Sequence, residues 1–276
     1  MKIESAIKKA YFDLKQNNIK TALLDSEILM SKVLKKDRSN ILLNSEKIIS
    51  NEDYIYFRKL ISSRLKNKPI AYLTGEKSFW KYEFDINDKV LIPRPETEEL
   101  VSLIIKREKN RNSINIIDIG TGSGCIAISL RKNINSKVMG IDISSEAITV
   151  ARKNILDESE NVDLVNDSIE KFKTDRMFDV IVSNPPYIPI SDKKLVDSLV
   201  LDNEPKTALF IQDDPLYFYR KILVFAKKNL NEGGRIYLEI NDLYVNEVLD
   251  LFQGYNPESI RDFYGKNRFI ICNMGK

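Results

Sequence analysis

The sequence predicts an α/β protein made of a small helical bundle and a larger sheet domain whose strands run mainly parallel. Three observations predict this fold class. Apolar residues recur at helical spacing from residue 3 to about 65, apolar runs alternate with helical segments after residue 95, and 276 residues exceed one minimal domain. We therefore expect a helical domain over 1–75, a β-hairpin linker over 76–95 and the sheet domain over 96–276.

The first region has the pattern of amphipathic helices without strand-like alternation. Its first apolar face consists of Ile3, Ile7, Ala10 and Leu14. Polar connections near 17–18 and 37–40 separate the helices and indicate a small bundle.

The same region carries most of the positive charge. Residues 1–75 hold 15 lysines and arginines against 8 acidic residues, whereas the remainder holds 28 against 32. The excess fits either solvated helix faces or a surface that binds a partner. We predict a partner-binding domain.

The second region is aromatic and β-branched around a polar turn. Residues 79–84 and 90–92 form two apolar runs, and Asn87-Asp88 between them is a turn dipeptide. A β-hairpin with its turn at Asn87-Asp88 is therefore expected. Pro95 then suits the first position of a helix to about residue 109. Arg94 and Glu96 either contact substrate or only start this helix, and the helix start is the preferred interpretation.

Beyond residue 109 strands and helices alternate. The expected strands are 114–119, 137–141, 162–165, 178–183, 234–240, 259–263 and 268–273. The expected helices begin at Gly124 and Ser145 and span 216–230 and 244–252. This order predicts helices on both faces of the sheet, and a terminal hairpin about 265–267 adds one antiparallel strand. Sites in such sheets lie at the carboxyl ends of the strands.

A glycine-rich loop follows the first of these strands. It comprises Gly120, Thr121, Gly122, Ser123 and Gly124. Glycines suit a sharp turn and a close approach of backbone to ligand, although a plain strand-to-helix turn is the alternative. The spacing is neither the dinucleotide pattern nor a phosphate loop, so an adenosine cofactor without a pyrophosphate fits best.

One acidic residue ends the second strand of this region, and another follows the third strand. Asp142, about 20 residues after the loop, can accept hydrogen bonds from both ribose hydroxyls, or else cap the helix after Ser144. Asp167 can receive an adenine amino hydrogen, or else form a turn. Both are candidate cofactor ligands.

The strand 178–183 leads into Asn184-Pro185-Pro186-Tyr187, which gives the chemical hypothesis. An amide or aromatic amine nitrogen is a weak nucleophile because its lone pair is delocalised. The Asn184 oxygen and the Pro185 carbonyl can accept hydrogen bonds from its two N–H groups, and Tyr187 offers a flat face. Asn184, Pro185 and Tyr187 are therefore the expected catalytic residues, and Pro186 completes the substrate site. A rigid exit turn is the structural alternative.

The composition excludes other chemistry. Histidine is absent, which removes a Ser-His-Asp triad and the commonest metal ligand. Cys125 and Cys272 form no CxxC pair, so neither a disulfide framework nor a metal site is expected. No apolar run approaches the roughly 18 residues of a membrane span, and the start lacks a secretory signal. We expect a cytoplasmic protein without membrane contact.

These residues resemble a known family. The glycine loop, Asp142 and Ser183–Tyr187 are similar to class I S-adenosylmethionine-dependent amino-methyltransferases, which have a Rossmann-like sheet. Further segments resemble one branch, the PrmC (HemK) family of release factor glutamine methyltransferases. These segments are Pro69–Gly75 with Phe79-Trp80, Leu91–Glu98, Asn203–Pro205 with Ala208-Leu209, and Arg261-Asp262 with Gly265–Arg268.

The resemblance implies methylation of N5 of the glutamine in the Gly-Gly-Gln loop of peptide chain release factors, with S-adenosylmethionine as cofactor. It also implies that the helical domain helps to hold the release factor. By position the cofactor would be lined by Gly120, Gly122, Gly124, Asp142, Asp167, Ser168 and Asn184. The sequence departs from the family pattern at two places. Ser168 stands where some relatives carry an aromatic residue, and Leu238–Asn241 lacks the small residue or histidine expected after Glu239.

Two other functions fit part of the sequence. N6-adenine methylation of DNA or RNA would use the same four residues, but it predicts a basic catalytic domain, and residues 76–276 carry a net charge of −4. A non-catalytic translation-factor binder would fit the basic front region, but it has no need of an intact Asn184–Tyr187 segment. Glutamine methylation by a monomer without direct nucleic-acid contact is therefore the main hypothesis.

Overall fold

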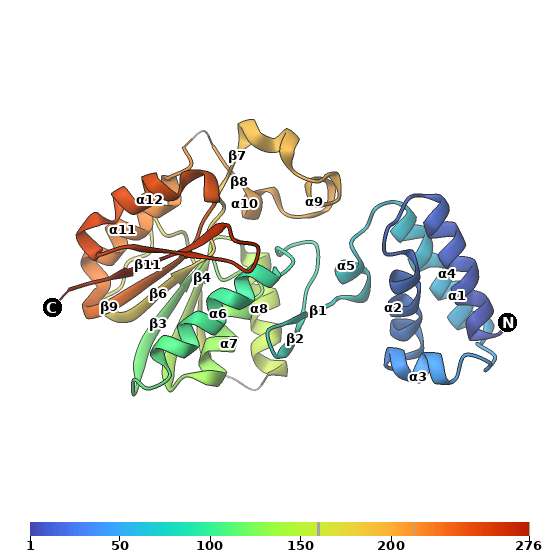
Figure 1. The fold of residues 1–276 in the computed structure, drawn as a ribbon. Coiled ribbons are helices and arrows are strands. Elements are labelled where there is room, and N and C mark those ends of the chain that lie inside the picture. Colours follow the sequence, from blue (N-terminus) through green and yellow to red (C-terminus); the bar gives the residue numbers. More distant parts are fainter. Residues whose placement is uncertain (159–160, 213, 276) are drawn as a thin grey trace. The chain divides into compact units, whose positions relative to one another are not determined.

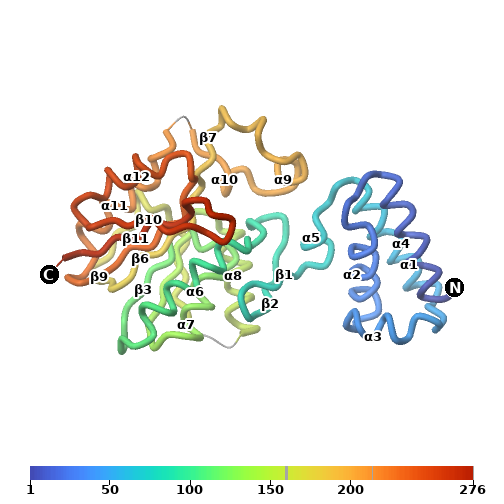
Figure 2. The backbone as a smooth tube through the Cα atoms, in the orientation of Figure 1, coloured from blue at the N-terminus to red at the C-terminus, as the bar shows by residue number. Residues whose placement is uncertain are grey.

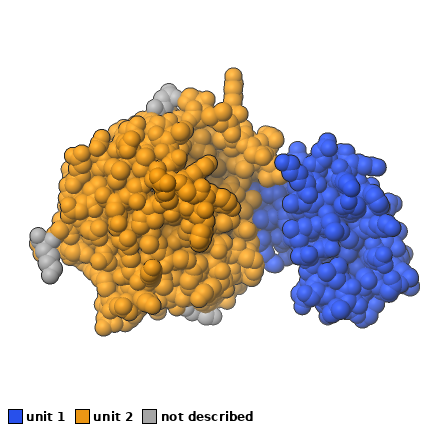
Figure 3. All heavy atoms as spheres, in the orientation of Figure 1, with its two compact units in different colours: residues 1–76 blue, residues 77–276 orange. Residues whose placement is uncertain are grey.

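The computed structural model describes residues 1–158, 161–212 and 214–275, which fold into two units, 1–76 and 77–276 (Figure 3). Each unit buries its own apolar core. Within the described ranges, no helix combines the length and the apolar character that crossing a membrane requires.

The first unit is a helical bundle, as the spacing predicted. Its helices are α1 (Ile3–Gln16), α2 (Ala22–Leu34), α3 (Arg38–Leu43), α4 (Asn51–Leu65) and α5 (Ile70–Thr74). Leu14, Leu29 and Phe57 from three different helices are fully buried together. An ion pair between Arg64 Nε and Asp25 Oδ2, 2.7 Å apart, lies buried between α4 and α2.

A short hairpin begins the second unit, but its predicted turn is wrong. The strands β1 (Glu76–Phe79) and β2 (Tyr82–Asp85) pair with each other, so the chain turns at Trp80-Lys81 and 90–92 is not a strand. Phe79 and Phe84 are both fully buried, with ring centroids 6.0 Å apart. In one continuous strand these two side chains would point to opposite faces, whereas the turn brings both to one core.

The main sheet has seven strands in the order β10-β11-β9-β6-β3-β4-β5. Its strands are β3 (Ile114–Ile119), β4 (Ser136–Asp142), β5 (Val162–Asn166), β6 (Phe178–Ser183), β9 (Leu230–Glu239), β10 (Glu258–Arg261) and β11 (Asn267–Asn273). Strands β9, β6, β3, β4 and β5 are parallel, and β11 is antiparallel to both of its neighbours. The predicted single antiparallel strand is therefore confirmed.

Helices cover both faces of this sheet (Figure 1). They are α6 (Pro95–Glu108), α7 (Cys125–Asn133), α8 (Ser145–Asp157), α11 (Tyr217–Asn229) and α12 (Val245–Leu251), with 3-10 turns η2 (Asp242–Tyr244) and η3 (Gln253–Tyr255). Ile116 packs with α6 and α7, whereas its neighbour Ile117 packs with α11 and α12. Successive strand residues thus fill two cores, which explains why the central strands carry apolar residues at consecutive positions.

One segment of the second unit was not anticipated. Between β6 and α11 the chain leaves the sheet and returns to it (Figures 1 and 2). It forms β7 (Ile188–Pro189), η1 (Ile190–Leu195), α9 (Ser198–Asn203), α10 (Lys206–Leu209) and β8 (Phe210–Ile211). These elements are too short for a periodic signal, so the sequence pattern gave no sign of them.

A buried carboxylate ties α6 to the sheet. Glu108 is fully buried and accepts hydrogen bonds from Tyr237 Oη, Arg235 Nη1 at 2.6 Å and Arg111 Nη1 at 2.9 Å. Removing Glu108 would leave the buried Tyr237 hydroxyl without its acceptor and two half-buried arginines without this carboxylate, which is strongly destabilising.

Accordingly, Glu108→Ala should lower the free energy of unfolding of the second unit by about 3 kcal/mol. The control is Glu258→Ala, which breaks the more exposed pair with Arg107 and should cost less than about 1 kcal/mol. Urea titration followed by fluorescence of Trp80, the single tryptophan of the chain, reports on this unit. Equal losses in the two variants would contradict the role of the buried network.

Candidate active site

The site lies where β3 and β6 end side by side. Ile119 and Ser183, the last residues of these strands, are paired in the sheet, and the Ser183 hydroxyl donates to the Ile119 carbonyl at 2.7 Å. The chain moves from β3 to β4 and β5 on one side and returns to β6 on the other, so this is a topological switch point. Ligands of open α/β sheets bind at such points. The glycine loop after β3 and Asn184 after β6 therefore lie next to each other at this edge of the sheet.

The glycine loop opens towards a pocket at this switch point. Gly120 and Gly122 have φ angles of +76° and +57°, a region that disfavours other residues, and a Cβ atom on either would enter open space. Both line the pocket. Gly124, with φ +81°, caps the start of α7, and a Cβ there would lie 3.3 Å from Ala151 Cβ. Two glycines thus face ligand space and the third allows close packing.

The other loop residues hold the turn from within. Thr121 Oγ1 donates to Asp118 Oδ2 at 2.6 Å, and burial raises the pKa of Asp118 to about 7. The Ser123 carbonyl accepts from Asn154 Nδ2 at 2.9 Å. Direct contact of Thr121 and Ser123 with a cofactor stays a prediction.

Asp142 connects the end of β4 to the loop. Its Oδ2 accepts from the Gly122 amide at 2.8 Å and its Oδ1 from the Ser144 amide at 2.9 Å. Burial raises the pKa of this carboxyl group above its usual value. The N-cap of α8 is instead Ser144, whose hydroxyl accepts from the Ala147 amide. Asp142 therefore lines the pocket beside the loop, with acceptor capacity remaining on both oxygens.

The pocket also includes most of the remaining predicted residues. Among its lining are Asp167, Ser168, Asn184, Pro185 and Pro186. Asp167 Oδ1 accepts from the Ser168 amide at 2.8 Å, and the Asp167 amide donates to the Asp142 carbonyl at 3.1 Å. The acidic residue that ends β4 and the one that follows β5 are thus adjacent. Their contacts with a ligand stay predictions.

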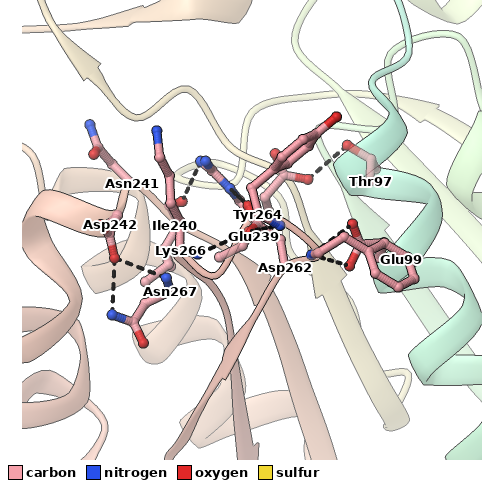
Figure 4. Close-up of polar contacts among 12 residues, drawn as sticks. Thr97, Glu99, Glu239, Ile240, Asn241, Asp242, Asp262, Tyr264, Lys266 and Asn267 are labelled. Atoms are coloured by element: carbon pink, nitrogen blue, oxygen red, sulfur yellow. Dashed lines mark hydrogen bonds and ion pairs between the residues drawn. The ribbon is translucent and has the colours of Figure 1, made fainter.

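Asn184 and Tyr187 converge on a buried glutamate that the sequence did not single out. Asn184 Nδ2 donates to Thr97 Oγ1 at 3.1 Å. Thr97 Oγ1 in turn donates to Glu239 Oε2 at 2.7 Å (Figure 4). The Tyr187 hydroxyl donates to Glu239 Oε1 at 3.3 Å. Burial raises the pKa of Glu239 to about 7, and burial also raises the pKa of Tyr187. The sequence feature that could have pointed to Glu239 is its place as an acidic residue at the end of a largely apolar strand segment.

Arg94 lies at the helix start, as expected, but its side chain makes no cap hydrogen bond and instead anchors the segment after β6. It occupies the N-cap of α6, and its Nη2 lies 2.6 Å from Glu204 Oε1. Glu204 Oε2 accepts from the Ile92 amide at 3.1 Å. Since Leu91 and Pro205 both line the pocket, the Glu204 contacts join two of its walls.

The part of the chain that the structure describes contains no cluster of side chains that could bind a metal ion. No group of three or more His, Cys, Asp or Glu residues there could hold an ion. Cys125 and Cys272 are both buried as free thiols.

Two family models match this chain. One described as "PrmC N-terminal domain" matches residues 5–75. The other, described as "Methyltransferase domain", matches residues 110–256 and so spans the glycine loop and Asn184. A solved methyltransferase from Pyrococcus furiosus superimposes with a TM-score of 0.56 at 25% identity, covering 78% of this chain and 98% of that one.

Curated relatives extend the similarity to nearly the whole chain. The release factor glutamine methyltransferase of Flavobacterium psychrophilum is 40% identical over 246 residues, 86% of each protein. The protein of that name in Leptospira interrogans is 39% identical over 280 residues, covering 98% of this chain and 97% of the relative. The sequence resemblance is thereby confirmed, and the chain belongs to the family of release factor glutamine methyltransferases.

Proposed function

We propose that this chain transfers a methyl group from S-adenosylmethionine to N5 of the glutamine in the Gly-Gly-Gln loop of peptide chain release factors. Membership of the family supports the reaction and the substrate class. The observation that carries the proposal is the position of Asn184-Pro185-Pro186 on the pocket wall, next to the glycine loop.

The pocket fits an adenosine-containing cofactor. Gly120 and Gly122 leave space where side chains would intrude, and Asp142 and Asp167 place acceptors for ribose hydroxyls and an adenine amino group. Ile143 and Ile169 add apolar surface to the same pocket. When bound, S-adenosylmethionine supplies an electrophilic methyl group carried on a sulfonium sulfur.

The chain's own residues orient the amide nitrogen. The Asn184 Oδ1 and the Pro185 carbonyl oxygen accept hydrogen bonds from the two N–H groups of the glutamine side chain, which directs the nitrogen lone pair. Positive charge grows on this nitrogen during transfer, so both hydrogen bonds strengthen in the transition state. The Tyr187 ring packs beside the planar amide, and its hydroxyl is held by Glu239.

The first unit supplies the release factor contact in this proposal. Residues 1–75 carry seven more basic than acidic side chains, whereas the catalytic part is net acidic. A negatively charged catalytic half does not suit a nucleic-acid substrate. Glutamine methylation is therefore favoured over adenine methylation and over a non-catalytic binder.

The substrate can be identified directly. The protein is incubated with methyl-labelled cofactor and, separately, with a release factor, with DNA and with RNA, and the label is located by mass spectrometry. We expect label on the glutamine of the Gly-Gly-Gln loop. Label on a base with none on glutamine would overturn the proposal.

For the hydrogen-bonding residue, Asn184→Ala should reduce methyl transfer at least about 100-fold because one acceptor for the amide is lost. Cofactor affinity, measured by calorimetry, should change little. The matched control is Asn231→Ala, which alters an asparagine at the opposite end of the sheet and should keep full activity. An Asn184→Ala variant as active as the control would rule out this mechanism.

For the cofactor, Asp142→Ala should raise the dissociation constant for S-adenosylmethionine by about tenfold or more, since it removes a charged acceptor and frees the Gly122 amide. Asp163→Ala, which breaks only an exposed pair with Arg176, is the control. Calorimetric titration distinguishes the two. Unchanged affinity in Asp142→Ala would remove Asp142 from the cofactor site.

A further inference from the structure

The hydrogen bonds behind Asn184 have a fixed direction. Thr97 Oγ1 lies 2.7 Å from Glu239 Oε2 and 3.1 Å from the Asn184 side-chain amide. A hydroxyl carries one hydrogen, and an ionised carboxylate only accepts. Thr97 therefore gives its hydrogen to Glu239 and must accept from Asn184, so the NH₂ group of Asn184 faces Thr97 and its Oδ1 faces away.

Burial restricts the hydrogen bonds of Thr97 and Glu239 to this direction. Thr97 and Glu239 are 3% and 1% exposed, so water does not substitute for either partner. The second oxygen of Glu239 accepts from Tyr187, another member of the proposed substrate site. One carboxylate thus ends two hydrogen-bond chains that begin at residues expected to contact the glutamine.

We propose that Thr97 and Glu239 are positioning residues that hold Asn184 with its carbonyl oxygen towards the substrate nitrogen. The proposal rests on the proposed function, because only a substrate with N–H groups needs an acceptor there. Turned by 180°, Asn184 would present its own NH₂ group to the NH₂ group of glutamine. Two donors would then face each other, and substrate orientation would be lost.

The ionisation of Glu239 sets the direction of the chain. A protonated Glu239 can donate to Thr97, which then donates to Asn184 Oδ1 and favours the turned amide. Burial raises the pKa of Glu239 to about 7, with Glu96 raising it and Thr97, Arg268 and Tyr187 lowering it. Protonation dominates below this value, so methyl transfer should rise as pH increases through about 7.

Two substitutions at Thr97 test the proposal. Thr97→Val keeps the shape without the hydroxyl, and Thr97→Ser keeps the hydroxyl. We expect kcat to fall about tenfold or more in Thr97→Val, with KM for the release factor and cofactor affinity within about twofold of wild type. Thr97→Ser should stay within about threefold of wild type and keep the rise in rate near pH 7, which Thr97→Val should lose. Equal kcat values in the two variants would overturn the proposal.

A second measurement needs no substrate and separates this proposal from the proposed function. The side-chain amide signals of Asn184, assigned by their loss in Asn184→Ala, are followed by ¹⁵N NMR from pH 5.5 to 8.5. We expect them to shift with a midpoint near 7 in wild type and to be independent of pH in Glu239→Gln. A shift that persists in Glu239→Gln overturns the positioning role. If wild type shows the shift but leaves release factors unmethylated, the proposed function fails while the hydrogen-bond chain stands.

Discussion

The parallel pairing of β3 with β6 is the constraint on which the rest of the site depends. Because Ile119 lies opposite Ser183, the residues that follow them emerge at one edge of the sheet. The glycine loop forms its half of the pocket through its backbone geometry. Asn184 reaches the pocket because it directly follows a buried strand. A register shift of one residue would turn the apolar side chains of β6 to the wrong faces. The two cores therefore fix the spacing between cofactor and substrate residues.

Those parts of the fold that depend on local pattern were predictable. The strands 114–119 and 178–183 have the predicted bounds, since apolar residues predominate in both and a glycine or a polar residue follows each. The hairpin turn was misplaced because Asn87-Asp88 is the stronger turn signal, whereas the actual turn at Trp80-Lys81 is set by burial of two phenylalanines. Tertiary packing overrode local propensity there.

Within the site, residues whose role follows from the backbone could be found in the sequence, and residues whose role depends on a distant partner could not. Gly122 and Asn184 follow predicted strands, and their residue types alone indicate a ligand-binding loop and an amide-binding residue. Thr97 and Glu239 are 142 positions apart, and nothing in either segment indicates the other. Thr97 also lies in a helix start, where a polar residue needs no special explanation.

Three buried glutamates of the second unit differ in their hydrogen-bond partners. Glu108 and Glu204 each receive hydrogen bonds from arginine, the usual compensation for a buried carboxylate. Glu239 is as deeply buried, yet its side chain accepts from two hydroxyl groups, and its pKa is raised to about 7. An acid that served stability alone would gain more from a cation at hydrogen-bond distance. The neutral donors make sense if the carboxylate instead sets the direction of hydrogen bonds that reach Asn184 and Tyr187.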